Sequence, residues 1–260
     1  CMKLMVNHQT HYMYTAEVRN SIQYIKMMPS SNAHQRVHSW DISVPGNKEI
    51  RKDAFHNLWM TCSQREPYYS LTIMAQGIVE LNPAHQSGLN DSINPNLFLQ
   101  PTESTQCNAA MKDFAQRHVP ALTRQHLIGL AQALLEHVPY ISNSTSVQGS
   151  AIDAFESRQG VCQDHSHIFI AMCKYLGLPA RYVSGYLYAQ NASHLASHAW
   201  AEVFVDQTWY CFDVSNLLFT PSSHVYVAIG RDYWDVAPVR GVREKGGVES
   251  MHSIVQVLGC

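Results

Sequence analysis

The spacing of apolar residues changes once along this chain of 260 residues, and that change constrains the fold more than any other feature. Before Leu81, short extended runs such as Ser21–Met27 and Leu71–Ala75 are typical of β-strands. Residues 82–101 are rich in Asn, Ser and Pro and follow no period. The sequence therefore predicts a β-rich N-terminal domain over 1–81 and a linker over 82–101.

Helical spacing dominates the chain after this break. Five apolar residues recur at intervals of three and four and end before Pro139: Leu127, Leu130, Leu134, Leu135 and Val138. Ser150 and Asp153 have the spacing of a capping box that opens a short helix. We predict a second domain over 102–260.

Composition excludes several classes of function. Charged residues make up only 15% of the chain and the formal net charge is -2, so the basic excess that nucleic-acid backbones require is missing. We find no signal stretch and no apolar run of the roughly 18 to 20 residues that span a bilayer. The seven cysteines have no paired spacing, which indicates reduced thiols. We expect a cytoplasmic protein without nucleic-acid or membrane partners.

Fifteen histidines are enough to suggest a metal site as an alternative. Candidate ligands are His194, His198 and Cys162, but the sequence contains neither an HExxH nor a CxxC motif. We expect no metal and no cofactor.

Cys162 stands at the predicted start of a helix that ends before Gly177. The apolar positions of this helix are Ile168, Phe169, Met172, Cys173 and Leu176. Gly160 lets the backbone turn into the helix, and the unpaired N–H groups of the first turn place partial positive charge beside the sulfur. Such a position favours the nucleophilic thiolate. The alternative is a buried structural cysteine, which is our interpretation of Cys173.

A predicted hairpin brings a histidine and an aspartate together. The extended runs 198–205 and 208–213 are separated by two residues, and a two-residue turn would place Trp200 opposite Asp213. His198 and Asp213 would then be diagonal neighbours on one face. A slip of one residue would separate them.

Cys162, His198 and Asp213 therefore supply, in chain order, a nucleophile, a base and the group that orients the base. Alone, His198 would be interpreted as an ordinary strand residue and Asp213 as a turn residue. Their joint occurrence favours a catalytic triad.

Four segments together resemble the bacterial transglutaminase-like superfamily: Gly160–Asp164, Gly177–Tyr186, Ser197–Glu202 and Trp209–Asp213. Parts of 12–80 resemble the N-terminal domain of such proteins, and 230–241 resembles the segment that closes their sheet. The resemblance implies an α+β fold with a papain-like core, in which helices pack on an antiparallel sheet that follows an antiparallel β domain. The sequence departs from the family at Val214-Ser215-Asn216, where Pro-Thr-Asn is usual.

The resemblance also implies a chemistry, in which a thioester on Cys162 leads to amide hydrolysis, as in a cysteine protease or amidase, or to transfer onto an amine, as in a transglutaminase. The substrate would be a peptide or protein amide. The oxyanion would bind the backbone N–H of Cys162 and one further donor, for which Tyr140 and then Gln163 are candidates. Trp200 is a candidate for contact with substrate. The alternative is a catalytically silent binding or scaffold module with the same fold.

Two acidic residues near the triad, Asp164 and Glu202, are interpreted as structural ion partners rather than proton carriers. Arg181 and Arg231 are their candidate partners.

Overall fold

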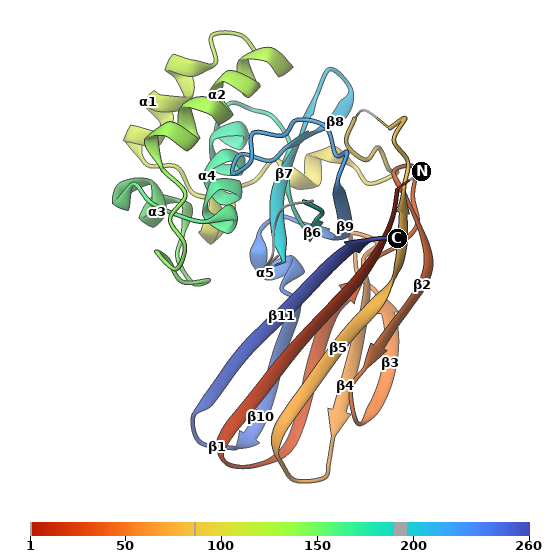
Figure 1. Ribbon diagram of the computed structural model, residues 1–260. Helices are drawn as coiled ribbons and strands as arrows, with labels where there is room; N and C mark the ends of the chain where they lie inside the picture. Colours follow the sequence, from red (N-terminus) through yellow and green to blue (C-terminus); the bar gives the residue numbers. More distant parts are fainter. Residues whose placement is uncertain (1, 86, 190–196) are drawn as a thin grey trace.

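The computed structural model describes residues 2–85, 87–189 and 197–260 of the chain. A long body of β-strands meets a second body in which helices cover a small sheet (Figure 1). The predicted α+β fold, with an antiparallel β domain ahead of a helix-covered sheet, is confirmed.

Five strands from the first 81 residues form an antiparallel sheet in the order β2-β5-β1-β4-β3. These strands are β1 (Met2–Met28), β2 (Gln35–Ser43), β3 (Asn47–Lys52), β4 (Leu58–Gln64) and β5 (Tyr68–Leu81). β1 and β5 are both longer than the extended runs recognised in the sequence. β5 continues through Gly77, where the sequence indicated its end. A Cβ atom at Gly77 would lie 2.0 Å from the carbonyl oxygen of Ser39, so the glycine admits the close approach of β2 rather than ending a strand.

β1 reverses near its middle, and its halves have different neighbours (Figure 1). Residues 2–13 pair with β5, whereas residues 21–28 pair with β4. The buried positions also change from even numbers, such as Leu4 and Val6, to odd numbers, such as Ile25 and Met27. Tyr12 of the first half packs on the cluster that contains Ile25 and Met27. The sheet therefore folds over to form two layers with a core between them.

The last two strands join this first body. β10 (Val239–Lys245) and β11 (Glu249–Gly259) both pair with β1. The prediction that 102–260 forms one continuous second domain differs from the structure here, since 239–259 complete the N-terminal sheet. The difference arises because buried residues such as Val255 and Val257 indicate a strand but not the sheet it joins.

Among the described residues, the second body contains five α-helices and a four-stranded antiparallel sheet in the order β8-β7-β6-β9. The helices are α1 (Ala109–His118), α2 (Arg124–His137), α3 (Ala151–Ser157), α4 (Cys162–Tyr175) and α5 (Tyr233–Val236). The strands are β6 (Ala180–Leu187), β7 (His198–Val205), β8 (Thr208–Phe212) and β9 (His224–Gly230). The predicted helix start at Cys162 and the capping box of Ser150 and Asp153 are confirmed.

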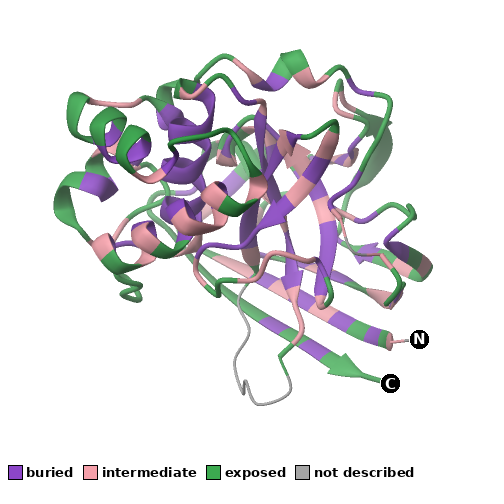
Figure 2. Ribbon diagram, turned by 90° about the horizontal axis from the view of Figure 1, so that it is seen from above, coloured by how far each residue is buried: buried purple, intermediate pink, exposed green. Residues whose placement is uncertain are grey.

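α4 is the central element of the second body. All residues from 163 to 174 are buried, and the helix appears among the purple elements of Figure 2. It packs on the face of β7 that carries Ala199, Ala201 and Val203. Since α4 is fixed on all sides, its first residue has a defined position relative to the sheet.

The two bodies share an apolar interface. Leu4 and Val79 of the first body pack against Tyr186 of β6 and Val225 of β9. His8 also bonds the Tyr186 hydroxyl at 2.8 Å. The N-terminal strands therefore support the sheet of the second body directly.

The predicted linker over 82–101 is an ordered segment in its described part. It includes the short helix η1 (Pro95–Phe98) and is followed by η2 (Glu103–Thr105). The carbonyl oxygen of Leu89 accepts a hydrogen bond from Arg181, and Asn90 accepts one from the backbone N–H of Trp209. The segment thus covers one side of the second sheet.

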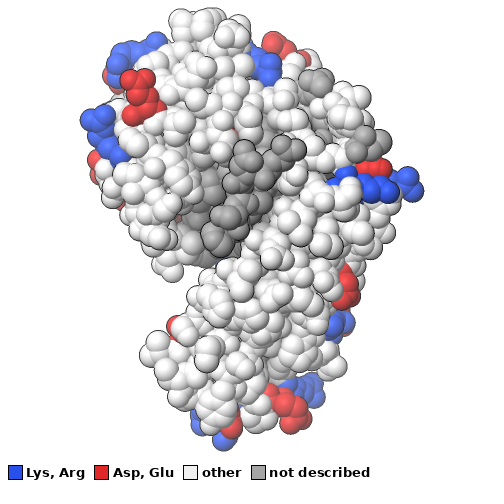
Figure 3. Space-filling model, viewed as in Figure 1, with Lys and Arg blue, Asp and Glu red and all other residues white. Residues whose placement is uncertain are grey.

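Charges are sparse and of mixed sign on the face shown in Figure 3. Within 2–85, 87–189 and 197–260, no helix has both the length and the apolar character that crossing a bilayer would demand.

Three buried histidines predict a loss of stability in mild acid. Burial lowers the pKa of His8, His34 and His167 to about 4. Between that value and the ordinary pKa of about 6.5, only the unfolded chain binds these protons, so their stability contribution is full above about pH 6.5 and is lost as the pH falls toward 4. Each histidine should cost up to about 3 kcal/mol of the unfolding free energy.

Urea unfolding at about pH 7 and about pH 5 measures this dependence, because most carboxylates titrate below that window. An unfolding free energy that stays constant across the window would contradict the prediction.

Candidate active site

Cys162 is held at the first turn of α4 by a polar cap. The Asp164 carboxylate accepts a hydrogen bond from the backbone N–H of Val161 at 2.9 Å and one from the Thr145 hydroxyl. A Cβ atom at Gly160 would lie 2.7 Å from the Asp164 Cβ, so only glycine leaves room for this cap. The half-buried Cys162 therefore stands beside backbone N–H groups that the helix leaves free.

The predicted hairpin register is confirmed. Asp206 and Gln207 form the two-residue turn with φ of 53° and 61°, the left-handed values that such turns use. β7 and β8 pair up to Ala201 opposite Phe212, and one further step places Asp213 beside Trp200. His198 Nε2 consequently lies 2.8 Å from Asp213 Oδ2.

The ring of His198 connects the sulfur and the carboxylate. Burial would lower the pKa of His198, but the carboxylate of Asp213 and the sulfur of Cys162 outweigh burial and raise it to about 10. Because Asp213 takes Nε2, the ring nitrogen left for the sulfur is Nδ1. An imidazolium at His198 would stabilise negative charge on a sulfur beside it.

Asp213 is fully buried yet surrounded by donors. Its Oδ2 lies 2.8 Å from Nε2 of both His198 and His224, and its Oδ1 accepts from the backbone N–H of Asn216 at 3.3 Å. Burial would raise the pKa of Asp213, but the hydrogen bonds from the two histidines hold it below its ordinary value. Asp213 therefore remains a carboxylate that can stabilise a charged His198.

The other predicted site residues have different environments. Tyr140 is 49% exposed, and it forms a β-bridge with Gly160, two residues before Cys162. The side-chain amide of Gln163 already donates to the carbonyl oxygen of Val147 at 2.9 Å. Trp200 is 0% exposed, so its prediction as a substrate contact is wrong. Its side chain instead packs edge-on against His224, with ring centroids 4.6 Å apart.

Sequence reasoning missed two residues that contact Asp213. Asn216 ends the segment Val214-Ser215-Asn216 and keeps the asparagine of the usual Pro-Thr-Asn. That asparagine, three residues after Asp213, was the signal that could have identified it. His224 begins β9, which lies on the far side of β6 from β7. No local sequence pattern indicates that a residue of β9 contacts Asp213, which follows β8.

The group of His198, Asp213 and His224 also resembles a metal site. Within the described residues, this is the one set of three His, Cys, Asp or Glu side chains whose donor atoms lie within 4.8 Å of one another. Both ring nitrogens are at hydrogen-bond distance from Asp213, and a bound divalent ion would replace the protons of those bonds. Of the metal ligands considered from the sequence, His194 lies outside the described residues.

Glu202 is a structural ion partner, as predicted. Its Oε1 bonds Arg181 at 2.8 Å and both side chains are fully buried, while its Oε2 accepts from Leu89 N–H and the Tyr226 hydroxyl. Asp164 caps α4 instead of pairing with an arginine. Arg231 pairs with Asp235 rather than with Asp164 or Glu202.

A Glu202→Gln variant is expected to lose about 3 kcal/mol of unfolding free energy, because Arg181 keeps its charge in a buried site and retains only Asp91 as a carboxylate partner. Urea unfolding measures the loss. The matched control is Glu49→Gln, which removes an exposed pair with Arg51 and should change stability by less than about 1 kcal/mol. Equal losses in both variants would show that the buried pair has no special role.

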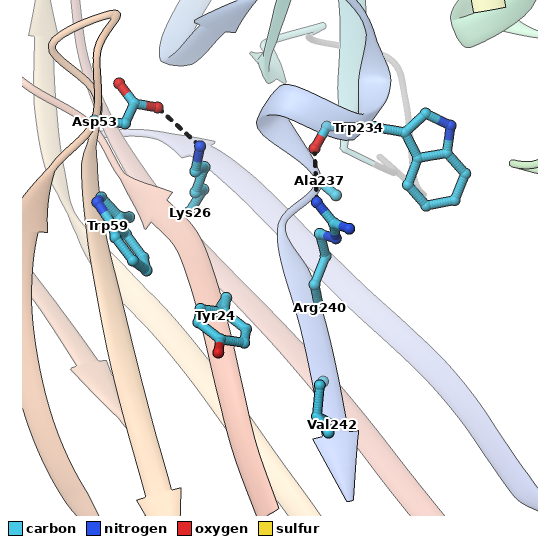
Figure 4. A pocket seen from close by; sticks show the side chains of 9 residues that line it. Tyr24, Lys26, Asp53, Trp59, Trp234, Ala237, Arg240 and Val242 are labelled. Atoms are coloured by element: carbon cyan, nitrogen blue, oxygen red, sulfur yellow. Dashed lines mark hydrogen bonds and ion pairs between the residues drawn. The ribbon is translucent and has the colours of Figure 1, made fainter. Parts of the chain in front are cut away.

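A pocket of about 400 Å³ lies between the second half of β1 and α5 (Figure 4). The rings of Tyr24 and Trp59 stack on one side of it with centroids 5.9 Å apart. Lys26 is already bound to Asp53 at 2.8 Å, and the Arg240 guanidinium bonds the carbonyl oxygen of Trp234 at 3.4 Å. None of the predicted site residues lines this pocket, so the candidate chemistry remains at Cys162.

Comparisons with known proteins give a family and a fold. Residues 4–80 match the family described as the Bacterial transglutaminase-like N-terminal region, and residues 115–214 match the Transglutaminase-like superfamily. An uncharacterized protein of Mycobacterium leprae is 28% identical over 277 residues, which cover 98% of each chain. One of Mycobacterium tuberculosis is 28% identical over 272 residues, which cover 91% of this chain and 86% of that protein.

Among solved structures, a protein of Cytophaga hutchinsonii named "Putative Cysteine Protease" superposes with a TM-score of 0.81 at 22% identity. The match covers 99% of this chain and 90% of the other, so the two proteins share the whole fold, including the N-terminal β body.

Proposed function

We propose that this chain, which belongs to the transglutaminase-like superfamily, is an enzyme that cleaves or transfers amide bonds through a thioester on Cys162. The proposal rests on that membership and on the grouping of Cys162, His198 and Asp213. The observation that carries the proposal is the ring of His198, which Asp213 holds at 2.8 Å and whose pKa is raised by both Asp213 and the sulfur of Cys162. A peptide or protein amide is the proposed substrate.

In the first half-reaction, the Cys162 thiolate attacks the amide carbonyl carbon and a C–S bond forms. The carbonyl oxygen becomes an oxyanion. His198, as imidazolium, then transfers its proton from Nδ1 to the amide nitrogen while the C–N bond breaks. An amine leaves and the acyl group remains on the sulfur as a thioester.

In the second half-reaction, neutral His198 removes a proton from water or from a primary amine as it attacks the thioester carbon. The C–S bond then breaks and the thiolate returns beside the imidazolium. Water produces a carboxylic acid, and an amine produces a new amide. Asp213 stabilises the charge on His198 in both halves.

The oxyanion requires at least two donors. The backbone N–H of Cys162 lies in the first turn of α4, where the helix leaves such groups unpaired. We propose the Tyr140 hydroxyl as the second donor, because Tyr140 bridges to Gly160, two residues before Cys162, and is exposed to a substrate. The Gln163 side chain is the weaker candidate since its amide is already bonded.

Turnover of a panel of peptide amides, with and without an added primary amine, tests the proposal. Carboxylic acid products identify a hydrolase, and new amides identify a transferase. Protein whose Cys162 has been alkylated is the blank, and equal product formation by the blank would overturn the proposal. Metal analysis of the same protein examines the proposal that no metal or cofactor takes part.

Alkylation by iodoacetamide separates the enzyme from a silent scaffold. Cys162 and Cys107 are both partly buried, and burial raises the pKa of Cys107 to about 11. At about pH 6, Cys107 is therefore almost wholly protonated, whereas the proposed mechanism requires a thiolate at Cys162 that an adjacent imidazolium stabilises. Allowing for the weaker nucleophilicity of a stabilised thiolate, Cys162 should react about 10² to 10³ times faster. Peptide mapping measures both rates, and equal rates would favour the scaffold.

A further inference from the structure

Asp213 has a second histidine partner that the proposed chemistry does not use. His224 is fully buried, and its Nε2 lies 2.8 Å from Oδ2 of Asp213, the oxygen that also bonds His198. A carboxylate can only accept hydrogen bonds, so each ring donates its Nε2–H to this oxygen. The centroids of the two rings are 6.2 Å apart. His224 therefore holds Asp213 from one side while Asp213 holds His198 on the other.

The ring of His224 is itself held in place. Trp200 packs edge-on against the His224 ring, with centroids 4.6 Å apart. The Nδ1 atom of His224 is buried and has no hydrogen-bond partner among the described residues. The backbone oxygen of His224 accepts a hydrogen bond of 2.6 Å from His34 Nε2. His34 comes from the N-terminal β body, so that body contacts the residue that supports Asp213.

Side chains of the N-terminal body also cap the free edge of β9. Gln35 bonds both backbone groups of Tyr226, at 2.7 Å to the N–H and 2.8 Å to the oxygen. Asn57 bonds Ile229 in the same manner, at 2.8 Å and 2.7 Å. These amides replace the neighbouring strand that an edge strand lacks. Gln35 acts two residues from His224, whereas Asn57 acts at the far end of the strand.

We propose that His224 is a positioning residue for Asp213, and that the N-terminal body keeps His224 in place through His34 and Gln35. With both rings on one oxygen, and with Asn216 on the other, the Asp213 carboxylate cannot rotate without breaking a hydrogen bond. His198 consequently keeps its proton on Nε2 and turns Nδ1 toward the sulfur. The consequence for turnover rests on the proposed function, but the geometry of His198 does not.

His224→Phe keeps a ring in the pocket and removes the donor, whereas His224→Gln retains an Nε2 donor at similar reach. We expect His224→Phe to lower kcat about tenfold or more with KM nearly unchanged, because Asp213 loses a charge-assisted hydrogen bond. His224→Gln should recover most of the loss. In proton NMR, the downfield Nε2–H resonance of His198 should move in the Phe variant and return in the Gln variant. An unchanged resonance, or a kcat that falls only in proportion to the folded fraction, would overturn the positioning role.

Gln35→Ala tests the link to the N-terminal body, and Asn57→Ala is its matched control. Both variants remove two hydrogen bonds from the β9 edge. We expect Gln35→Ala to lower kcat several-fold and shift the His198 resonance, and Asn57→Ala to leave both nearly unchanged. Equal effects of the two variants would refute the link through His224. If no amide is turned over while the resonance still responds to position 224, the proposed function fails and the positioning role stands.

Discussion

A Cys162→Ala variant is expected to lose at least about 10⁵-fold of amide-cleaving activity, because the acyl intermediate of the proposed reaction forms on the sulfur of Cys162. The hydroxyl of Ser215, two residues after Asp213, is engaged with His165 at 2.7 Å. Water activated by His198 without the thiol would lose the covalent step and most of the acceleration that it provides. Initial rates with the best amide of the panel measure the loss.

Cys107→Ala is the matched control for this variant. Cys107 is also partly buried and packs on the main core of the second body, just before the start of α1. Its removal should cost at most a modest amount of stability and leave kcat/KM within about twofold of the wild type. Retention of more than about 1% activity in Cys162→Ala, or a comparable loss in Cys107→Ala, would place the nucleophile elsewhere.

The sequence predicts the Cys162, His198 and Asp213 grouping because each contact depends on a short-range pattern. The helix start follows from apolar spacing after Gly160, and the structure begins α4 at Cys162. The hairpin register follows from a turn of two residues, since parity then fixes which side chains share a face. The contact between α4 and β7 is long-range, but the sequence shows an apolar face on each element, and these two faces pack together.

The rest of the site depends on pairings that the sequence does not specify. His224 reaches Asp213 because β9 joins the sheet on the far side of β6, a choice that involves residues distant along the chain. The sequence does not distinguish a buried Trp200 from one that lines a cleft, because aromatic strand residues occur in both environments. Trp200 is buried by its contacts with His224 and Tyr226. The return of β10 and β11 to β1 is similarly non-local.

An Asp213→Asn variant is expected to lower kcat/KM by about 10⁴, the size of the effect of the same change in a serine-protease triad. The Oδ2 atom accepts from two imidazoles and Oδ1 accepts from Asn216, so all sides of the carboxylate face donors. An asparagine amide must direct its NH₂ toward one of these donors. If it faces His198, the ring must accept at Nε2 and carry its proton on Nδ1, where the sulfur can no longer transfer a proton to it.

Loss of the charge acts in the same direction. The hydrogen bond to Asp213 helps to raise the pKa of His198 to about 10, so a neutral partner should lower that pKa and move the alkaline limb of the kcat/KM profile to lower pH. The matched control is Asp91→Asn, which removes a carboxylate from Arg181 outside the site and should leave the profile in place. If Asp213→Asn stays within about tenfold of the wild type with an unmoved alkaline limb, His198 takes its orientation from another group, and the triad must be reduced to a Cys162–His198 pair.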